Sequence, residues 1–177
     1  LIEEGLPRVD PPCPHFGLCG GCRWQDLSYA HQLQLKDQMV RASFKRRGLA
    51  VHWEPIASSP DPFYYRNKME FSFGSDGDGR PQLGLHVRER YNRVFDLESC
   101  LLQSEASNSI VDSVRAHATR LSVPVYDLKT HEGMLRFLVV RDAKETGQTM
   151  VNLVVREYPS DLIDDLMAAV LDQVGDL

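Results

Sequence analysis

Three of the four cysteines in this chain of 177 residues lie in the short segment Cys13–Cys22, and the fourth is Cys100. Three thiols close together with a distant fourth are typical of a site in which four thiolates bind a metal ion or a cluster. Such a site must bring Cys100 onto the first loop, which ties the N-terminal segment to the rest of the chain. The two glycines between Cys19 and Cys22 allow a tight bend that brings backbone N–H groups near sulfur.

The cysteine spacing alone leaves three interpretations open. An iron–sulfur cluster is favoured by the grouping of three plus one, because zinc ribbons usually supply their ligands as two close pairs. A structural zinc ion also accepts four thiolates. The third interpretation is two disulfides, or four thiols buried as small apolar groups. The first residues do not resemble a signal peptide, so we expect a reducing, cytoplasmic setting, which favours a metal over disulfides.

The composition predicts one domain, or one domain with a small appendage, because 42% of the residues are hydrophobic and can form a core. No apolar run is long enough to predict a membrane span. The net charge of -5 argues against a protein that binds nucleic acid over its whole surface. Cations gather in 36–47 and 66–93, whereas no Lys or Arg follows Arg156. This asymmetry is compatible with an anionic partner on one side, or with ordinary solvated faces. The chain begins without Met, and we expect it to be a piece of a longer protein.

The apolar periodicity predicts an α+β domain, with helices packed on an antiparallel sheet and an N-terminal loop that binds metal. Ser28 can cap a helix that ends near Arg47, and a second helix begins at Ser104 or Ser107. Strands are expected at 63–74, 83–87, 93–97, 135–141 and 149–156. A last helix capped by Ser160 is expected to bury Leu162, Ile163, Leu166, Met167, Val170, Leu171 and Val174.

No known catalytic motif is present in the chain. It lacks the glycine-rich phosphate loops, the nucleophile elbow and the paired-histidine zinc motif. His15 lies inside the cysteine loop, where we expect it to orient a ligand or to be exposed rather than to bind metal. We therefore identify no catalytic residue.

The cysteine pattern Cys13–Cys22 with Cys100 occurs together with the motif Tyr-Arg-Asn-Lys-Met-Glu-Phe-Ser-Phe-Gly at Tyr65–Gly74. With Leu83–His86 and Gly133–Arg136, this combination resembles the RNA (uracil-5-)-methyltransferase family. It is most similar to the iron–sulfur-containing members that act on 23S ribosomal RNA. The resemblance covers nearly the whole chain.

This resemblance implies a 4Fe-4S cluster held by Cys13, Cys19, Cys22 and Cys100. It also implies a longer parent enzyme, with an N-terminal OB-fold, a central α/β domain that carries the cluster, and a C-terminal domain that binds S-adenosylmethionine and performs catalysis. The chain matches the cluster segment, 1–25, and the central domain, 26–177. We therefore expect no catalytic or cofactor-binding residue in the chain, and no activity from the chain alone.

The family implies that the central domain holds folded RNA while a base is flipped into the catalytic site. Arg66 and Lys68 match basic positions of its first strand and are expected on one face, whereas Glu70 departs from the basic residue of some relatives. His86 and Arg136 are expected on the same surface. The implied partner is RNA, ribosomal rather than transfer RNA, bound by a cytoplasmic monomer with no membrane contact. The alternative function is a zinc-stabilised module that binds nucleic acid or protein without catalysis.

Overall fold

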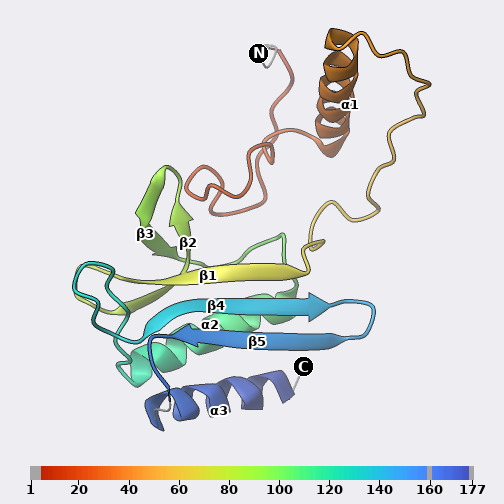
Figure 1. Ribbon diagram of the computed structural model, residues 1–177. Coiled ribbons are helices and arrows are strands. Elements are labelled where there is room, and N and C mark those ends of the chain that lie inside the picture. Colours follow the sequence, from red (N-terminus) through yellow and green to blue (C-terminus); the bar gives the residue numbers. More distant parts are fainter. Residues whose placement is uncertain (1–4, 159–160, 176–177) are drawn as a thin grey trace.

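The computed structural model of the protein describes residues 5–158 and 161–175 (Figure 1). A five-stranded antiparallel sheet has the order β3-β2-β1-β4-β5. The strands are β1 (Lys68–Ser75), β2 (Pro81–Val87), β3 (Arg90–Asp96), β4 (Leu135–Ala143) and β5 (Gln148–Val155). The helices are α1 (Tyr29–Arg46), α2 (Glu105–Arg120) and α3 (Asp161–Gly175). The predicted α+β class with an antiparallel sheet is confirmed.

One face of the sheet carries the core, because α2 and α3 both lie against it (Figure 1). Phe71 and Leu83 of the sheet are fully buried together with Ile110 of α2 and Leu166 of α3. Side chains alternate along each strand, so apolar residues of β1, β2 and β4 reach this core from every second position. No helix within 5–158 and 161–175 is long and apolar enough to cross a membrane.

Both predicted helix starts that fall on described residues are confirmed. The Ser28 hydroxyl accepts from the backbone N–H of His31 at 3.3 Å, and that of Ser104 accepts from Ser107 at 3.2 Å. These bonds satisfy N–H groups that have no partner inside the first helical turn. The predicted cap Ser160 lies outside the described residues.

The first strand begins five residues later than expected from the sequence, so the prediction of a strand from residue 63 is wrong. Tyr64 has a φ of 54°, which breaks an extended conformation. The N–H groups of Tyr64 and Arg66 donate to the carbonyls of Leu101 and Leu102 at 2.7 and 2.8 Å. The segment before Lys68 is therefore held by the chain that follows Cys100, and not by the sheet.

The predicted buried face of the last helix is too wide. Leu162 and Leu171 are exposed, whereas Ile163, Leu166 and Val170 are buried. A residue turns by about 100° around the helix axis relative to its predecessor. Leu162 and Leu171 thus fall at the two edges of the stripe, beyond the reach of the sheet. The side chain of Val174 lies outside the described part of the chain.

The sheet divides beside the cysteine loop. β1 pairs with β4 along Lys68–Ser72 but with β2 along Ser72–Ser75. Beyond Gly84, β2 continues upward with β3 as a hairpin that leaves β1 (Figure 1). This divergence leaves an opening beside the N-terminal half of β1, and the cysteine loop lies there.

Candidate metal centre

All four cysteines line one cavity of about 430 Å³ in this opening of the sheet. Met69 and Glu70 of β1 and Leu85 of β2 also line it. The four cysteines are free thiols, so the structure does not contain the disulfides that the sequence left open. Cys13, Cys19 and Cys22 are partly exposed and Cys100 is buried. The predicted return of Cys100 to the first loop is present in the structure.

The cysteine loop is shaped by its own backbone. The N–H of Phe16 donates to the Cys13 carbonyl at 3.1 Å, and the N–H of Cys19 donates to the His15 carbonyl at 2.9 Å. The N–H of Gly21 donates to the Cys19 sulfur at 3.3 Å. A backbone donor of this kind stabilises negative charge on a thiolate. The predicted role of the glycines near sulfur is thus realised at Gly21.

The loop is fixed to the β2–β3 hairpin at its far end. Cys19 forms an isolated bridge with Val87, and the N–H of Arg88 donates to the Leu18 carbonyl at 2.8 Å. A Cβ on Gly20 would lie 3.9 Å from the Arg88 Cα, so the two backbones run close together. Movement of the loop would therefore move the hairpin.

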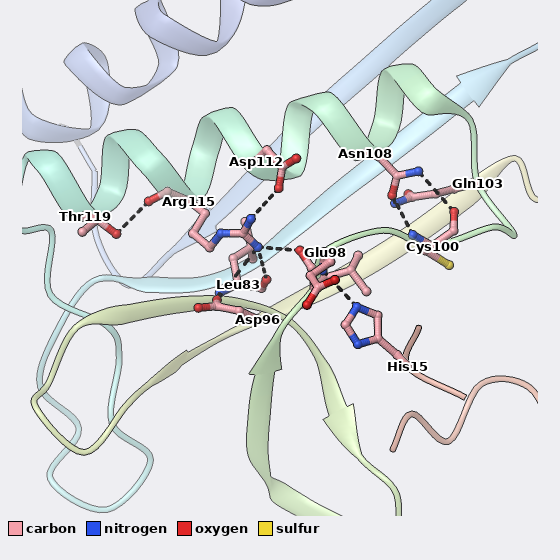
Figure 2. Close-up of polar contacts among 11 residues, drawn as sticks. His15, Leu83, Asp96, Glu98, Cys100, Gln103, Asn108, Asp112, Arg115 and Thr119 are labelled. Carbon is pink, nitrogen blue, oxygen red and sulfur yellow. Dashed lines mark hydrogen bonds and ion pairs between the residues drawn. The ribbon is translucent and has the colours of Figure 1, made fainter. Parts of the chain in front are cut away.

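A network of side chains from α2 holds the segment that carries Cys100 (Figure 2). Asn108 Oδ1 accepts from the Cys100 N–H at 2.9 Å, and Asn108 Nδ2 donates to the Cys100 carbonyl at 3.2 Å. The Asn108 Oδ1 atom also accepts from Gln103 at 2.9 Å. Arg115 donates to the Leu97 carbonyl at 2.6 Å and pairs with Asp112. These bonds fix Cys100 to the rigid core.

His15 joins the two halves of the thiol cavity. Its side chain is buried, and its Nε2 atom accepts from the Glu98 N–H at 3.0 Å (Figure 2). Its ring lies 4.9 Å from that of Phe95. The expectation that His15 orients a neighbour fits this geometry, whereas the expectation of an exposed side chain is wrong.

The thiols interact electrostatically across the cavity. Burial is the main cause that raises the pKa of Cys19 and Cys100 above the ordinary value of 9.0. Backbone N–H groups oppose this rise at both sulfurs, and negative charge on Cys22 and Cys13 adds to it at both. Without a metal, burial therefore favours the protonated form of Cys19 and Cys100. A bound cation would reverse this preference, because metals bind the thiolate form.

Within the described part of the chain, no group of three or more His, Cys, Asp or Glu side chains is arranged to hold a metal ion. A single zinc ion bonds sulfur at about 2.3 Å, which draws four sulfurs to within roughly 4 Å of one another. The cavity brings together four thiols and a backbone N–H near sulfur, which are the donors that a thiolate-bound metal ion or cluster requires.

Three of the four residues predicted to bind RNA lie together at the same cavity. Arg66, Lys68 and His86 contribute to its lining. The Lys68 ammonium is 3.2 Å from Glu70, and His86 Nε2 is 3.0 Å from the Ser72 hydroxyl. Arg66 precedes β1, so it does not share a strand face with Lys68 as the sequence had predicted.

Arg136 lies apart from this group. It is absent from the lining of the thiol cavity, and its guanidinium stacks 4.7 Å from the ring of Tyr126. The prediction that it shares one surface with the other three residues is therefore not supported by its contacts.

The sequence analysis noted the cations of 66–93 but did not place three of them together at the tip of the β2–β3 hairpin. Arg88, Arg90 and Arg93 are exposed there around Tyr91, which is 85% exposed. Three guanidinium groups beside an accessible aromatic ring can bind phosphates and stack on a base. The signal was present in the sequence as a cluster of arginines in a short turn, but only the hairpin shows that they share one tip.

The chain is similar over almost its whole length to proteins named uncharacterized RNA methyltransferases. The protein of Caldanaerobacter subterraneus subsp. tengcongensis is 38% identical over 94% of this chain, and that of Thermotoga maritima is 39% identical over 97%. A protein of Nitratidesulfovibrio vulgaris is 40% identical over 90%. The chain spans only 37%, 38% and 34% of these relatives, respectively. No protein-family model matches the chain.

A solved structure has a similar fold. It is the tRNA (uracil-54, C5)-methyltransferase of Pyrococcus abyssi in complex with S-adenosyl-L-homocysteine. The TM-score is 0.62 and the sequence identity is 27%, over 89% of this chain and 35% of that one. The structural similarity thus covers most of this chain, but only part of the longer protein.

Proposed function

We propose that this chain is the thiol-rich, RNA-contacting part of an S-adenosylmethionine-dependent RNA (uracil-5-)-methyltransferase. The observation that carries this proposal is the similarity of nearly the whole chain to three RNA methyltransferases. A structural neighbour that methylates uracil C5, and holds the demethylated cofactor product, supports the same reaction and cofactor for the parent. The parent would work in the cytoplasm, where its RNA is found.

The RNA we propose as substrate is 23S ribosomal RNA. The cysteine pattern that resembles this branch supports it, although the structural neighbour is named for tRNA. In this proposal 1–25 is the cluster segment and 26–177 is the central domain, and the chain contributes no catalytic residue and no cofactor site. The chain alone would therefore bind RNA without methylating it.

The proposed group at the thiol cavity is a 4Fe-4S cluster bound by Cys13, Cys19, Cys22 and Cys100. Supporting features are the four free thiols around one cavity and the Gly21 N–H directed at sulfur. Such a cluster can transfer one electron and also crosslinks the chain segments that bind it. The protein's own contribution is to hold the cysteine loop against Cys100 through His15 and Asn108.

RNA would bind beside this centre. Arg66 and Lys68 are exposed at the cavity and can contact phosphates, while His86 can donate to a base or a sugar. The hairpin tip around Tyr91 extends this surface, because the cysteine loop holds it in place. The net charge of the chain is negative, so this local gathering of cations matters more than the total.

The test is to delete the parent gene and map 5-methyluridine by mass spectrometry in 23S ribosomal RNA and in tRNA. We expect loss of a 23S modification, restored by the wild-type gene and restored poorly by Arg66→Ala with Lys68→Ala. Loss only from tRNA would overturn the choice of substrate. Unchanged 5-methyluridine in both RNAs would favour the alternative, a zinc-stabilised binding module.

A further inference from the structure

A second cavity lies beside the thiol cavity, and we call it the aromatic cavity. Its volume is about 810 Å³. Pockets for small molecules and for single building blocks of larger ligands measure roughly 300–1,000 Å³. Gly21, Cys22 and Gln25 line both cavities. A group bound in the aromatic cavity would therefore lie next to the thiol centre.

Rings from three segments of the chain line the aromatic cavity. They come from the end of the cysteine loop, from the start of α1 and from the segment before β1: Trp24, Tyr29, Phe63 and Tyr65. Each of these side chains is at least partly exposed, and Tyr65 is 55% exposed. Accessible aromatic rings of this kind stack on the unpaired bases of RNA, because every base has an apolar flat face.

These rings are held in place by bonds that need no ligand. Gln32 Nε2 donates to the Trp24 carbonyl at 2.9 Å, and the Tyr29 hydroxyl accepts from the Ser59 N–H at 2.8 Å. The residues on both sides of Tyr65 donate to carbonyls of the segment before α2. A cavity that is already ordered loses little conformational entropy when a ligand binds.

Gln25 supplies a buried hydrogen-bond acceptor at this cavity. Its side chain is only 8% exposed, and its Oε1 atom has no hydrogen-bond partner among the described residues. A buried acceptor without a partner is rare and destabilising, so it favours a ligand that donates to it. The carboxamide of Gln matches adenine, because its oxygen accepts from the 6-amino group and its N–H groups can donate to a ring nitrogen.

Charged side chains of the lining suit the phosphates of a polynucleotide. Arg23 and Lys36 are exposed and line the cavity, together with one carboxylate, that of Asp61. The cations thus exceed the anions in the lining. Arg and Lys are the residues that most often contact the phosphates on either side of a recognised base.

We propose that the aromatic cavity binds an unpaired adenine of the RNA. The adenine stacks on the rings, its 6-amino group donates to Gln25 Oε1, and its flanking phosphates lie near Arg23 and Lys36. This inference rests on the proposed function, because it takes RNA as the partner. A base held in this cavity would fix the position of the RNA along the surface that carries Arg66 and Lys68.

The test compares two labelled decaribonucleotides of uridine by fluorescence anisotropy on the anaerobically purified chain 1–177. One carries a central adenosine, and the other carries purine riboside, which lacks the 6-amino group. We expect the adenosine oligomer to bind about tenfold more tightly. Gln25→Leu should bind both oligomers equally. Gln38→Leu is the matched control, because Gln38 is exposed on α1 and does not line the cavity.

A second measurement locates the bound base. In a Trp53→Phe background Trp24 is the only tryptophan, and the adenosine oligomer should quench its fluorescence. Tyr65→Ala should weaken the binding of both oligomers by about fivefold or more, since stacking does not depend on the amino group. Tyr158→Ala is the control, because Tyr158 is 66% exposed and outside the cavity.

Equal binding of the two oligomers by the wild-type chain would overturn the proposal, and this comparison needs no variant. A uridine-only oligomer that binds as tightly as the adenosine oligomer, or binding without a change in Trp24 fluorescence, would also overturn it. So would loss of the adenine preference in the full-length parent, because another part of the parent would then cover the cavity.

Methylation by the parent is assayed separately. An adenine preference that depends on Gln25, in a parent that leaves 5-methyluridine unchanged, supports the adenine site and overturns the proposed function. A parent that methylates RNA without any adenine preference supports the proposed function and overturns the adenine site.

Discussion

The Nε2 atom of His15 accepts a hydrogen bond from the backbone N–H of Glu98 at 3.0 Å, across 83 positions of sequence. His15 lies between the first two cysteines of the loop, and Glu98 lies two residues before Cys100. The bond therefore connects the two segments that carry the four thiols. It also shows that direct protein contacts hold these segments near each other.

Replacing His15 by Ala should weaken the metal site. The Glu98 N–H would lose its buried partner, which costs about 1–3 kcal/mol of unfolding free energy. Because outer contacts of this kind orient ligands, we expect metal affinity to fall by about 10- to 100-fold. Chelator competition on the anaerobic protein measures this. His52→Ala is the control, since that side chain is 87% exposed, and equal affinities in both variants would contradict the assigned role.

Replacing Asn108 by Ala should loosen Cys100. Its side chain accepts from the Cys100 N–H and donates to the Cys100 carbonyl, so the substitution leaves two backbone groups without partners. We expect a loss of about 1–3 kcal/mol of unfolding free energy. The Cys100 thiol of the metal-free protein should also react faster with a maleimide. Asn92→Ala, on the exposed hairpin, should change neither quantity, and unchanged Cys100 labelling in the Asn108 variant would count against the role of this residue.

Much of the fold can be predicted from local sequence signals. The serine caps and the strand patterns at 135–141 and 149–156 specify elements that the structure confirms. The true start of β1 could not be predicted, because Tyr64 and Arg66 bond to carbonyls that follow Cys100, and such long-range bonds leave no local pattern. Local sequence patterns indicate which helices and strands form. They do not show which distant segment bonds to the residues at the end of a strand.

The candidate site was likewise predicted only in part from the sequence. The cysteine spacing predicted that four thiols would meet, because their number and grouping are unusual. The roles of Asn108 and Arg115 escaped notice, since an Asn and an Arg on a helix are commonplace, and only folding brings them to the segment around Cys100. Arg136 matched the family motif, yet its stacking on Tyr126 separates it from the cavity.

The metal-free protein should become less stable when the pH rises above the ordinary pKa of a cysteine thiol. Burial raises the pKa of Cys19 and Cys100 above 9.0 in the folded state. The unfolded chain then releases protons before the folded chain does, so unfolding free energy is retained below pH 9.0 and falls as the pH rises through the folded pKa. Urea unfolding at about pH 8 and about pH 10 measures the fall. Cys19→Ser should reduce it, whereas a rise in stability with pH would contradict the assignment.

The hairpin tip should contribute to RNA binding. Tyr91→Ala should cost about 1–3 kcal/mol if the ring stacks on a base. Arg90→Ala should reduce the slope of log affinity against log salt by about 0.7 to 0.9, the release expected for one phosphate contact. Fluorescence anisotropy with a 23S fragment measures both. Lys144→Ala, at the tip of the β4–β5 hairpin, is the control, and equal effects from all three variants would contradict a specific role for this tip.

The most direct test of the account is the metal content of the chain after anaerobic purification. Iron, acid-labile sulfide and zinc are measured on the same sample, together with the Cys100→Ser variant. The account predicts about four iron and four sulfide ions per chain, and loss of both from the variant. About one zinc ion per chain without sulfide, or iron and sulfide that persist in the variant, would contradict it.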